Sequence, residues 1–225
     1  MPITTVHLMR HGEVDNPEGI LYERLPGFGL SERGHEMVAM SAKWLADTGK
    51  DIALIVSSPL QRARESAAPA ARIFDQPVQI EPRLTEAGNK LRGEKIHSSR
   101  MTLMNPRFWH LYYAPWLPSW GEHYRDIAKR MRDAVSHVRA LTPPGREALV
   151  VSHQLPIWTL RRYATGKPLV HDPRQRECAL ASITSFFFDN ATLIGYDYAS
   201  PAATLLEEAR DMTPGTSAAE MNTGH

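Results

Sequence analysis

Short apolar runs alternate with longer amphipathic stretches along most of the chain. Residues 3–9 are rich in β-branched side chains, residues 52–56 and 148–151 are continuous apolar runs, and a shorter run covers residues 78–80. Such runs are typical of strands that are covered on both faces of a sheet. The stretches between them place apolar residues at helical spacing. This alternation predicts an α/β fold, a three-layer α/β/α sandwich with a mostly parallel sheet.

Capping residues mark where the predicted helices begin. Ser31 can cap the helix that follows the first run. After the second run, Ser58 offers an N-cap and Pro59 stands at the first helical position. Pro156 lies near the start of the helix after the third run. Each pattern matches the preferences of helix amino termini, where unpaired amides accept a side-chain partner or tolerate proline.

Three segments depart from this alternation. The segment SITSFFFDNATLIGYDY predicts a β-hairpin that turns at Asp189 and Asn190, because both residue types tolerate positive φ. Residues 83–120 lack a sustained period, which predicts a lid insertion. Residues 201–225 are rich in Ala, Thr, Gly and Glu, which predicts a flexible tail. We therefore expect one domain over residues 1–200.

Composition narrows the function classes. With 26 Lys and Arg against 25 Asp and Glu, the net charge of +1 provides no global field for nucleic acid or an anionic membrane. The only cysteine, Cys178, cannot form an intramolecular disulfide, and we expect a buried thiol. The start MPITTVHLMR resembles neither a signal peptide nor a membrane span, so we expect a cytoplasmic protein. A homodimer is compatible with the sequence, which does not fix the oligomeric state.

Cationic side chains stand at the ends of three predicted strands. Arg10 and His11 end the first run, Arg62 lies in the first turn after the second, and His153 follows the third. Taken singly, His11 reads as a hydrogen-bonded strand-end residue, Arg62 as a solvated helix residue and His153 as a cap. Because the carboxyl ends of parallel strands meet at one edge of a sheet, the four together predict a site for a compact anion such as a phosphoryl group.

This combination suits phosphoryl transfer. A neutral imidazole can attack phosphorus and split a hydrolysis into phosphorylation and dephosphorylation of the enzyme. Arginines can stabilise the charge on the equatorial oxygens. Gly12 leaves room for backbone and ligand to approach closely. Departure of the alkoxide requires a proton, so a carboxylic acid should lie nearby.

Three motifs carry a family resemblance. LMRHGE, SSPLQRARESA and VVSHQ resemble, in order and spacing, the motifs of the histidine phosphatase superfamily, in its phosphoglycerate-mutase-like branch. The resemblance covers about residues 3–198. It implies that His11 is the nucleophile that becomes phosphohistidine. It also implies that Arg10, Arg62 and His153 bind the phosphate, with His153 part of the catalytic set.

The resemblance also suggests roles for four further residues. The family acid stands in a pattern like L-x-E, and RLTEAGN supplies Glu86 as the proton donor, with a surface carboxylate as the alternative. Glu13 is too close to the nucleophile's own loop to be preferred. Glu122 resembles a helix start that supports the site or its cap. Asn16 resembles a phosphate-binding position, and an Asn-Pro turn explains it equally well.

The same motifs leave the reaction open between two outcomes. Glycolytic mutases typically carry a Trp-Asn pair, a GW-x-D stretch and a Tyr-Gly-Gly segment, where this chain has EVDNPEG, RLPGFGLSERG and EAGNKLRGEKI. These departures favour a phosphomonoester phosphatase acting on a small phosphorylated, anionic metabolite. A phosphoglycerate mutase and a catalytically silent phospho-ligand binding domain are the alternatives. No H-x-x-x-H with a helix-borne Glu and no Cys-His ligand set is present, so we expect no metal and no cofactor.

The predicted lid is locally basic and aromatic. Its basic residues face either solvent or the site, and in the second case the substrate carries another anionic group. Its aromatic residues pack the lid onto the body or stack on a larger leaving group. The basic residues are Arg83, Lys90, Arg92, Lys95, Arg100 and Arg107.

Overall fold

A six-stranded sheet forms the centre of the molecule. The computed structural model describes residues 2–88 and 121–211 of the chain. The strand order is β3-β2-β4-β1-β5-β6. The first four strands of that order run parallel, whereas β5 runs antiparallel to β1 and to β6. The strands are β1 (Thr4–Arg10), β2 (Ile52–Ser57), β3 (Val78–Ile80), β4 (Glu147–Ser152), β5 (Ile183–Asp189) and β6 (Thr192–Ala199).

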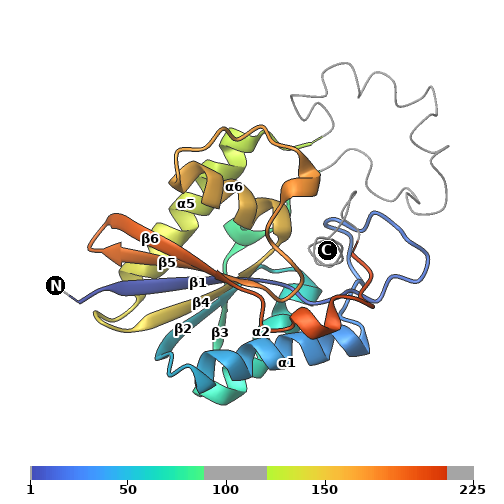
Figure 1. Ribbon diagram of the computed structural model, residues 1–225, viewed down its shortest axis with the longest axis horizontal. Coiled ribbons are helices and arrows are strands. Elements are labelled where there is room, and N and C mark those ends of the chain that lie inside the picture. The colour runs from blue at the N-terminus through green and yellow to red at the C-terminus, as the bar shows by residue number, and fades with distance from the viewer. Residues whose placement is uncertain (1, 89–120, 212–225) are drawn as a thin grey trace, which may run out of the picture.

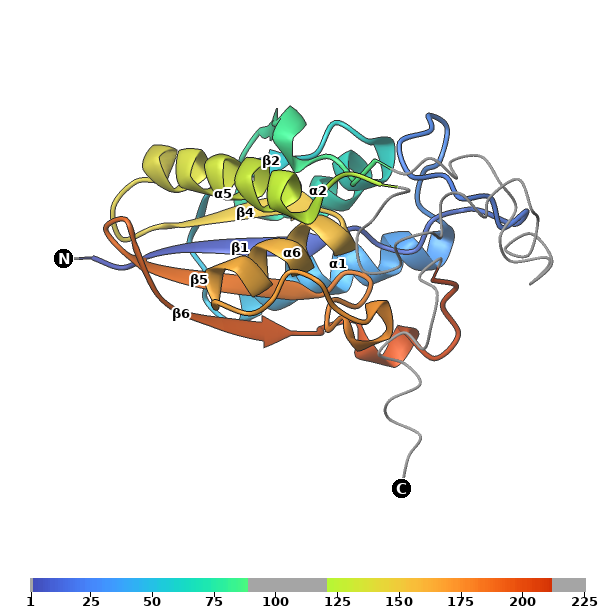
Figure 2. The ribbon, with the colours of Figure 1, turned by 90° about the horizontal axis from the view of Figure 1, so that it is seen from above.

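Helices cover both faces of the sheet, as the sequence predicts. α5 and α6 lie on one face and α1 and α2 on the other (Figure 1). Figure 2, seen from above, shows α5 and α6 lying along the strands. The described helices are α1 (Glu32–Asp47), α2 (Gln61–Phe74), α5 (Tyr124–Leu141) and α6 (Gln154–Ala164), with short 3-10 turns η1 (Pro82–Leu84), η3 (Pro173–Gln175) and η4 (Ala203–Leu205). The three-layer sandwich is confirmed.

The alternation of side chains along the inner strands explains why both faces need cover. On β1, Leu8 packs with the α5 and α6 side, and the next residue, Met9, packs with the α1 and α2 side. On β4, Val150 and Val151 divide in the same way. All four residues are fully buried. Successive strand residues point to opposite faces, so a continuous apolar run requires a helical layer on each side.

The strand register brings three strand ends level with one another. Arg10, at the end of β1, pairs with Ser152 at the end of β4. Ser57, at the end of β2, pairs with Val151, one residue before Ser152. The segments that leave these ends therefore start side by side at one edge of the sheet. This is the edge where α/β proteins place their ligands.

Several local predictions are confirmed and one is wrong. Ser31 caps α1, because its hydroxyl accepts a hydrogen bond from the amide of Gly34. The predicted hairpin joins β5 and β6, with Asn190 at φ 54°. Ser58 does not cap α2: the helix begins at Gln61 and its N-cap position makes no side-chain hydrogen bond. The Ser58 hydroxyl contacts His153 at 2.8 Å and accepts a longer hydrogen bond, 3.4 Å, from the amide of Leu60, which precedes the helix.

The two segments expected to be irregular have different outcomes. Most of the predicted lid, residues 89–120, lies outside the described residues, so the lid stays a prediction. Residues 201–211, predicted as the start of a flexible tail, pack against the body through Ala202 and Leu206, which are buried against α1. Residues 212–225 lie outside the described part. The prediction rested on the overall composition of residues 201–225 and overlooked the apolar residues of its first part, of which Leu205 and Ala209 also pack against this cluster.

No helix in residues 2–88 and 121–211 combines the length and the apolar character that crossing a membrane requires.

Candidate active site

The level strand ends bring the predicted residues together. His11 follows β1 directly, Arg62 lies in the first turn of α2, and His153 separates β4 from α6. The rings of His11 and His153 stand 5.1 Å apart between centroids, at an interplanar angle of 58°. Arg62 is close enough to both imidazoles to lower their pKa values. Arg10, at the end of β1, is nearly as buried as the other three.

A single hydrogen bond fixes which nitrogen of His11 is free. Its Nδ1 lies 2.8 Å from the carbonyl oxygen of Gly12. Because a carbonyl can only accept, Nδ1 must carry the proton. In a neutral imidazole the other nitrogen, Nε2, then holds a lone pair. The backbone around His11 is also held, since its amide donates to Ser152 and its carbonyl accepts from Ala181.

The surroundings keep both histidines neutral. Burial lowers the pKa of His11 well below its ordinary value, and the positive charges of Arg62 and Arg10 lower it further. Burial likewise lowers the pKa of His153, with Arg62 as the next cause. A neutral imidazole is the form that can attack phosphorus. The same arginines that would bind an anion thus keep the predicted nucleophile unprotonated.

His153 is held by one group and faces another. Its Nε2 lies 2.8 Å from the hydroxyl of Ser58, which can either donate or accept. Its Nδ1 lies 3.9 Å from the nearer carboxylate oxygen of Glu86. If Ser58 donates to Nε2, the proton of His153 resides on Nδ1, on the side of Glu86. That tautomer would present a donor to an anion in the site.

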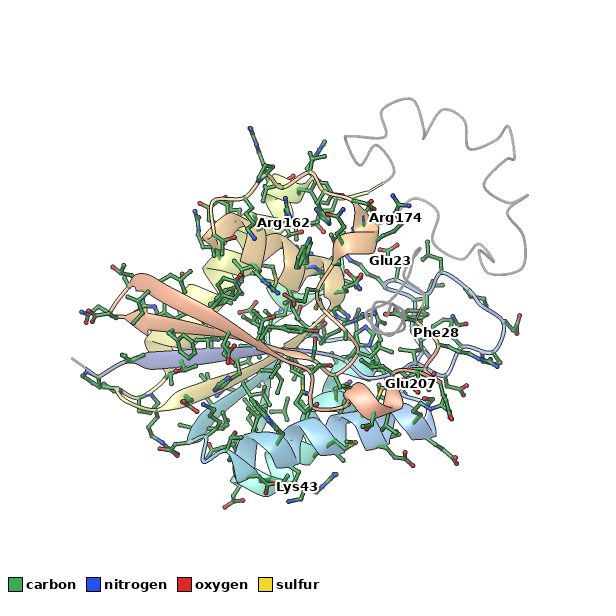
Figure 3. The ribbon with its side chains drawn as sticks, in the orientation of Figure 1. Glu23, Phe28, Lys43, Arg162, Arg174 and Glu207 are labelled. Carbon is green, nitrogen blue, oxygen red and sulfur yellow. The ribbon has the colours of Figure 1, made fainter. Side chains whose placement is uncertain are left out.

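Arg62 crosses from α2 to the loop between β1 and α1. One of its terminal nitrogens donates to the carbonyl of Glu23 over 2.6 Å, and its guanidinium lies 4.7 Å from the ring centre of Tyr22. Burial raises the pKa of Tyr22 to about 12, so its hydroxyl stays protonated. Figure 3 shows Glu23 and Phe28 of this loop beyond the carboxyl ends of the strands, and Lys43 projecting from the outer side of α1.

Three buried nitrogens at the site have no hydrogen-bond partner within residues 2–88 and 121–211: Nε of Arg10, Nε of Arg62 and Nδ1 of His153. Buried polar groups are normally paired, because an unpaired one loses its contact with water without compensation. That all three belong to residues predicted to bind phosphate indicates a site built to receive oxygen atoms from a ligand.

The segment that carries Glu86 is clamped by charged side chains. Arg24 donates to the carbonyl of Glu86 over 2.7 Å, and Arg130 donates to the carbonyl of Thr85 over 2.8 Å. The carboxylate of Glu122 accepts from both arginines, at 2.9 Å from Arg24 and 2.7 Å from Arg130. These contacts fix the backbone on either side of Glu86. Glu122 thus helps to hold the segment of Glu86, and its support of a functional site or cap stays a prediction.

A model of the histidine phosphatase superfamily, branch 1, matches residues 6–194 of the chain. The chain belongs to this superfamily. The uncharacterized protein Rv0525 of Mycobacterium tuberculosis is 50% identical over 200 residues, which cover 89% of this chain and 98% of that protein. The probable phosphoglycerate mutase GpmB of Photorhabdus laumondii subsp. laumondii is 27% identical over 185 residues, which cover 79% and 83%.

Solved structures give the same fold. The mycobacterial glucosyl-3-phosphoglycerate phosphatase Rv2419c matches with a TM-score of 0.69 and 25% identity, covering 88% of this chain and 98% of that chain. Members of the histidine phosphatase superfamily that resemble this chain therefore include both phosphatases and mutases.

Asn16 and Glu13, the two other candidate residues of the loop between β1 and α1, make contacts beside the site. Both polar atoms of the Asn16 amide bond to the backbone of Ile20, at 2.9 and 3.0 Å, so Asn16 shapes its own loop and its phosphate contact stays a prediction. Glu13 is buried and accepts from the hydroxyl of Ser31 over 2.5 Å and from the amide of Arg210 over 2.6 Å. Glu13 thus connects the start of α1 to the segment formed by residues 201–211.

Gly12 is required by a neighbouring helix. A Cβ placed on Gly12 would lie 2.5 Å from the carbonyl oxygen of Gly34 in α1. A Cβ on Gly34 would in turn lie 2.1 Å from the carbonyl oxygen of Glu13. That Gly12 admits the ligand stays a prediction. The structure shows that Gly12 lets α1 approach the backbone beside His11.

Several site residues were missed from the sequence. Ser58 was assigned to a helix cap, although it stands in the SSPLQRA motif that resembles the superfamily. Tyr22 and Arg24, in the loop between β1 and α1, and Arg130, in α5, carry no local signal, because each contacts residues far from it in the sequence. Asp211 lies in the segment predicted as a flexible tail, yet its carboxylate binds Arg10.

One group of residues has the composition of a metal site. Within residues 2–88 and 121–211, His11, Glu86 and His153 offer ligand atoms that all lie within 4.8 Å of one another. Burial is the first cause of the lowered pKa values of the two histidines, and the positive charges of Arg10 and Arg62 lower them further, so these charges act at the same point. A positive potential disfavours a cation and favours an anion at the same point. The residues therefore fit a phosphoryl group better than a metal ion.

Proposed function

We propose that this protein is a phosphomonoester phosphatase that forms a phosphohistidine on His11 and acts on a small anionic metabolite. The observation that carries the proposal is the protonation state of His11. Its Nδ1 donates to Gly12, and burial beside Arg62 lowers its pKa, so Nε2 holds a lone pair at neutral pH. A neutral imidazole among guanidinium donors suits attack on phosphorus.

In the first half of the proposed reaction, Nε2 of His11 forms a bond to phosphorus while the bond from phosphorus to the ester oxygen breaks. Arg10 and Arg62 stabilise the charge on the equatorial oxygens, and their buried Nε donors, which have no partner among the described residues, are available for this. Glu86, protonated at the start, transfers its proton to the departing alkoxide. The alcohol leaves, and the phosphoryl group remains on His11.

In the second half, water attacks the phosphoryl group and the bond from phosphorus to Nε2 breaks. Glu86, now a carboxylate, takes a proton from that water and is ready for the next cycle. His11 regains its lone pair, held in place by the bond from Nδ1 to Gly12. The nucleophile, the acid and the anion-binding groups of both steps are side chains of the protein, and we propose that the reaction proceeds without a metal ion.

Arg176 supports a substrate with a further negative charge. It donates to Nε2 of His171 over 2.9 Å and to the side-chain oxygen of Gln154, next to His153, over 3.3 Å. These acceptors are neutral, and no carboxylate in the described ranges forms an ion pair with it. A half-buried arginine without a counterion favours an anionic ligand group.

Phosphatase activity is favoured over mutase activity by the sequence. The chain departs from the glycolytic mutase pattern in the segments EVDNPEG, RLPGFGLSERG and EAGNKLRGEKI. The match to the mycobacterial phosphatase Rv2419c covers almost all of that chain. Because both reactions pass through phosphohistidine, only the fate of the phosphoryl group distinguishes them.

The test is a panel of phosphomonoesters in which free phosphate and phosphoglycerate isomerisation are measured in the same reactions, with and without EDTA. We expect phosphate release, no isomerisation and no effect of EDTA. Mass spectrometry under conditions that avoid acid should find the phosphoryl group on His11. Turnover with the label elsewhere, or with none, would falsify the mechanism. Isomerisation without release would instead establish a mutase.

A further inference from the structure

The segment formed by residues 201–211 contacts Arg10, the first residue of the RHG motif. The carboxylate of Asp211 accepts from both terminal nitrogens of Arg10, with one oxygen 2.8 Å from Nη1 and the other 2.7 Å from Nη2. Nη1 also donates to the carbonyl of Cys178 over 2.8 Å. Both charged side chains are buried, with 4% of Arg10 and 7% of Asp211 exposed. Water therefore has little access to compete for the hydrogen bonds of this pair.

The way Arg10 is held leaves one of its edges for a ligand. A guanidinium offers an end edge, made of Nη1 and Nη2, and a side edge, made of Nε and one Nη. Asp211 takes the end edge. Nε, on the side edge, is buried and has no partner among the described residues. An oxyanion can bind two donors of that edge at once.

We propose that Asp211 is a positioning residue, which holds Arg10 by its end edge so that the side edge faces the phosphoryl group. This inference rests on the proposed function, because the phosphoryl group is the ligand that Arg10 would meet. Without Asp211, the long side chain of Arg10 would sample other rotamers. Binding of the substrate would then have to fix one of them, and the entropy lost in doing so would lower the affinity. Asp211 itself does not touch the reacting atoms.

The segment that carries Asp211 is anchored at several points. The amide of Arg210 donates to Glu13, the residue that follows the RHG tripeptide. Two residues earlier, Glu208 accepts from Arg33 of α1 through its carbonyl, at 2.7 Å, and through its carboxylate, at 3.0 Å. Leu206 is buried against the same helix. The contact of the Arg210 amide and the burial of Leu206 deliver Asp211 to Arg10 as part of a fixed structure, whereas the exposed carboxylate of Glu208 contributes little.

A negative group beside an anion site has an opposite reading, in which Asp211 competes with phosphate for Arg10. The two readings predict opposite signs. If Asp211 positions Arg10, its removal weakens phosphate binding. If it competes, its removal strengthens binding, because a like charge has left the site. Asp211→Asn keeps the size and one acceptor oxygen, so it separates charge and bidentate pairing from shape.

The experiment compares Asp211→Asn with Glu208→Gln, a control that alters an ion pair of the same segment whose carboxylate side chain is 81% exposed. Inhibition by inorganic phosphate and orthovanadate, KM for p-nitrophenyl phosphate and Tm are measured for each. We expect Asp211→Asn to weaken phosphate inhibition about tenfold or more, as for loss of a hydrogen bond to a charged group. Its kcat should fall much less, and Glu208→Gln should stay near wild type.

A second variant keeps the test independent of folding. Asp211→Glu restores a carboxylate, so it should recover part of the phosphate affinity. In an Arg10→Lys background, Asp211→Asn should have little further effect, because the bidentate partner is already gone. Equal phosphate affinity in Asp211→Asn and Glu208→Gln, or tighter binding in Asp211→Asn, overturns the proposal.

Failure of the proposed function gives a different result. Calorimetric titration with inorganic phosphate reports on Arg10 without turnover. A wild type that binds phosphate but releases none from esters contradicts the phosphatase assignment, while the comparison of Asp211→Asn with Glu208→Gln still decides the role of Asp211. A wild type that binds no phosphate contradicts both proposals.

Discussion

At the scale of single residues, the chemistry depends on how each imidazole is tethered. His11 is tethered through Nδ1 to a carbonyl, and His153 through Nε2 to a hydroxyl. The free nitrogen of each ring is therefore a different atom. In the proposed reaction, Nε2 of His11 attacks phosphorus and Nδ1 of His153 contacts the phosphoryl oxygens. Two identical side chains thus acquire separate tasks from their neighbours.

Replacing Glu86 with Gln tests the proposed acid. Glu86 lies 3.9 Å from His153 and is held by the clamp of Arg24, Arg130 and Glu122. General acid catalysis contributes about 100-fold to 10,000-fold, mainly for poor leaving groups. We expect kcat/KM for an alkyl phosphate to fall about 100-fold or more in Glu86→Gln, and that for p-nitrophenyl phosphate to fall far less.

The control for this prediction is Glu81→Gln, which changes a carboxylate of the same segment that pairs with Arg83. Its kcat/KM should stay near wild type for both substrates. If Glu86→Gln slows the alkyl and aryl substrates by the same factor, Glu86 is not the proton donor.

The local motifs predicted residues that follow strand ends, and the structure brings those residues together. Arg10, His11, Arg62 and His153 were identified because each stands beside a recognisable run or motif. Their supporting partners have no such signal. Asp211 is separated from Arg10 by 201 positions, and its contact depends on a fold that places residue 211 beside the end of β1. Sequence patterns report neighbours along the chain better than neighbours in space.

At the scale of elements, the predicted strands match those observed to within a residue or two, because a buried run has clear limits. The start of α2 was misplaced for a physical reason. Ser58 has the side chain of an N-cap, but its hydroxyl contacts His153, and α2 begins at Gln61 without a side-chain cap. The shorter contact of this hydroxyl is with His153, a residue 95 positions away, and such a tertiary contact cannot be recognised from the local sequence.

The close approach of α1 to the loop after β1 predicts the effect of Gly34→Ala. Helix propensity alone favours alanine by about 1 kcal/mol. The new Cβ, however, would lie 2.1 Å from the backbone oxygen of Glu13, which cannot rotate away as a side chain can. Such overpacking typically destabilises by about 1 to 3 kcal/mol, so we expect a net loss in the free energy of unfolding.

Chemical denaturation measures this loss, and Glu36→Ala, at an exposed position of α1, is the matched control, with a change expected within about 0.5 kcal/mol. A Gly34→Ala variant as stable as that control would mean that α1 can shift away from the loop at little expense.

At the scale of the whole molecule, buried neutral histidines connect stability to pH. Burial lowers the pKa values of His11 and His153 well below 6.5 and lowers that of His171 to about 4. Between those values and the ordinary histidine pKa, the unfolded chain binds protons that the folded chain does not. The stabilisation is complete above about pH 7.5 and declines as the pH falls through about 6.5.

The expected decline in the free energy of unfolding from pH 7.5 to 5.5 is about 1.4 kcal/mol for each of the three histidines. This range lies above the ordinary titration of carboxylates, so their contribution is small there. Urea denaturation at several pH values measures it. His171→Gln, whose amide oxygen can still accept from Arg176, should reduce the decline by one histidine's share. A constant free energy across the range would contradict the prediction.

The strand order has a consequence for biosynthesis. β1, which leads into His11, pairs only with β4 and β5 among the described strands. The ribosome adds about 5 to 20 residues per second, so roughly 7 to 30 seconds separate the synthesis of β1 from that of β4, the first of its two partners to be made. During that interval the amino-terminal strand is apolar and unpaired. The nascent chain is therefore exposed to chaperones or to aggregation during that time, and its candidate active site can form only after β4 and His153 have been synthesised.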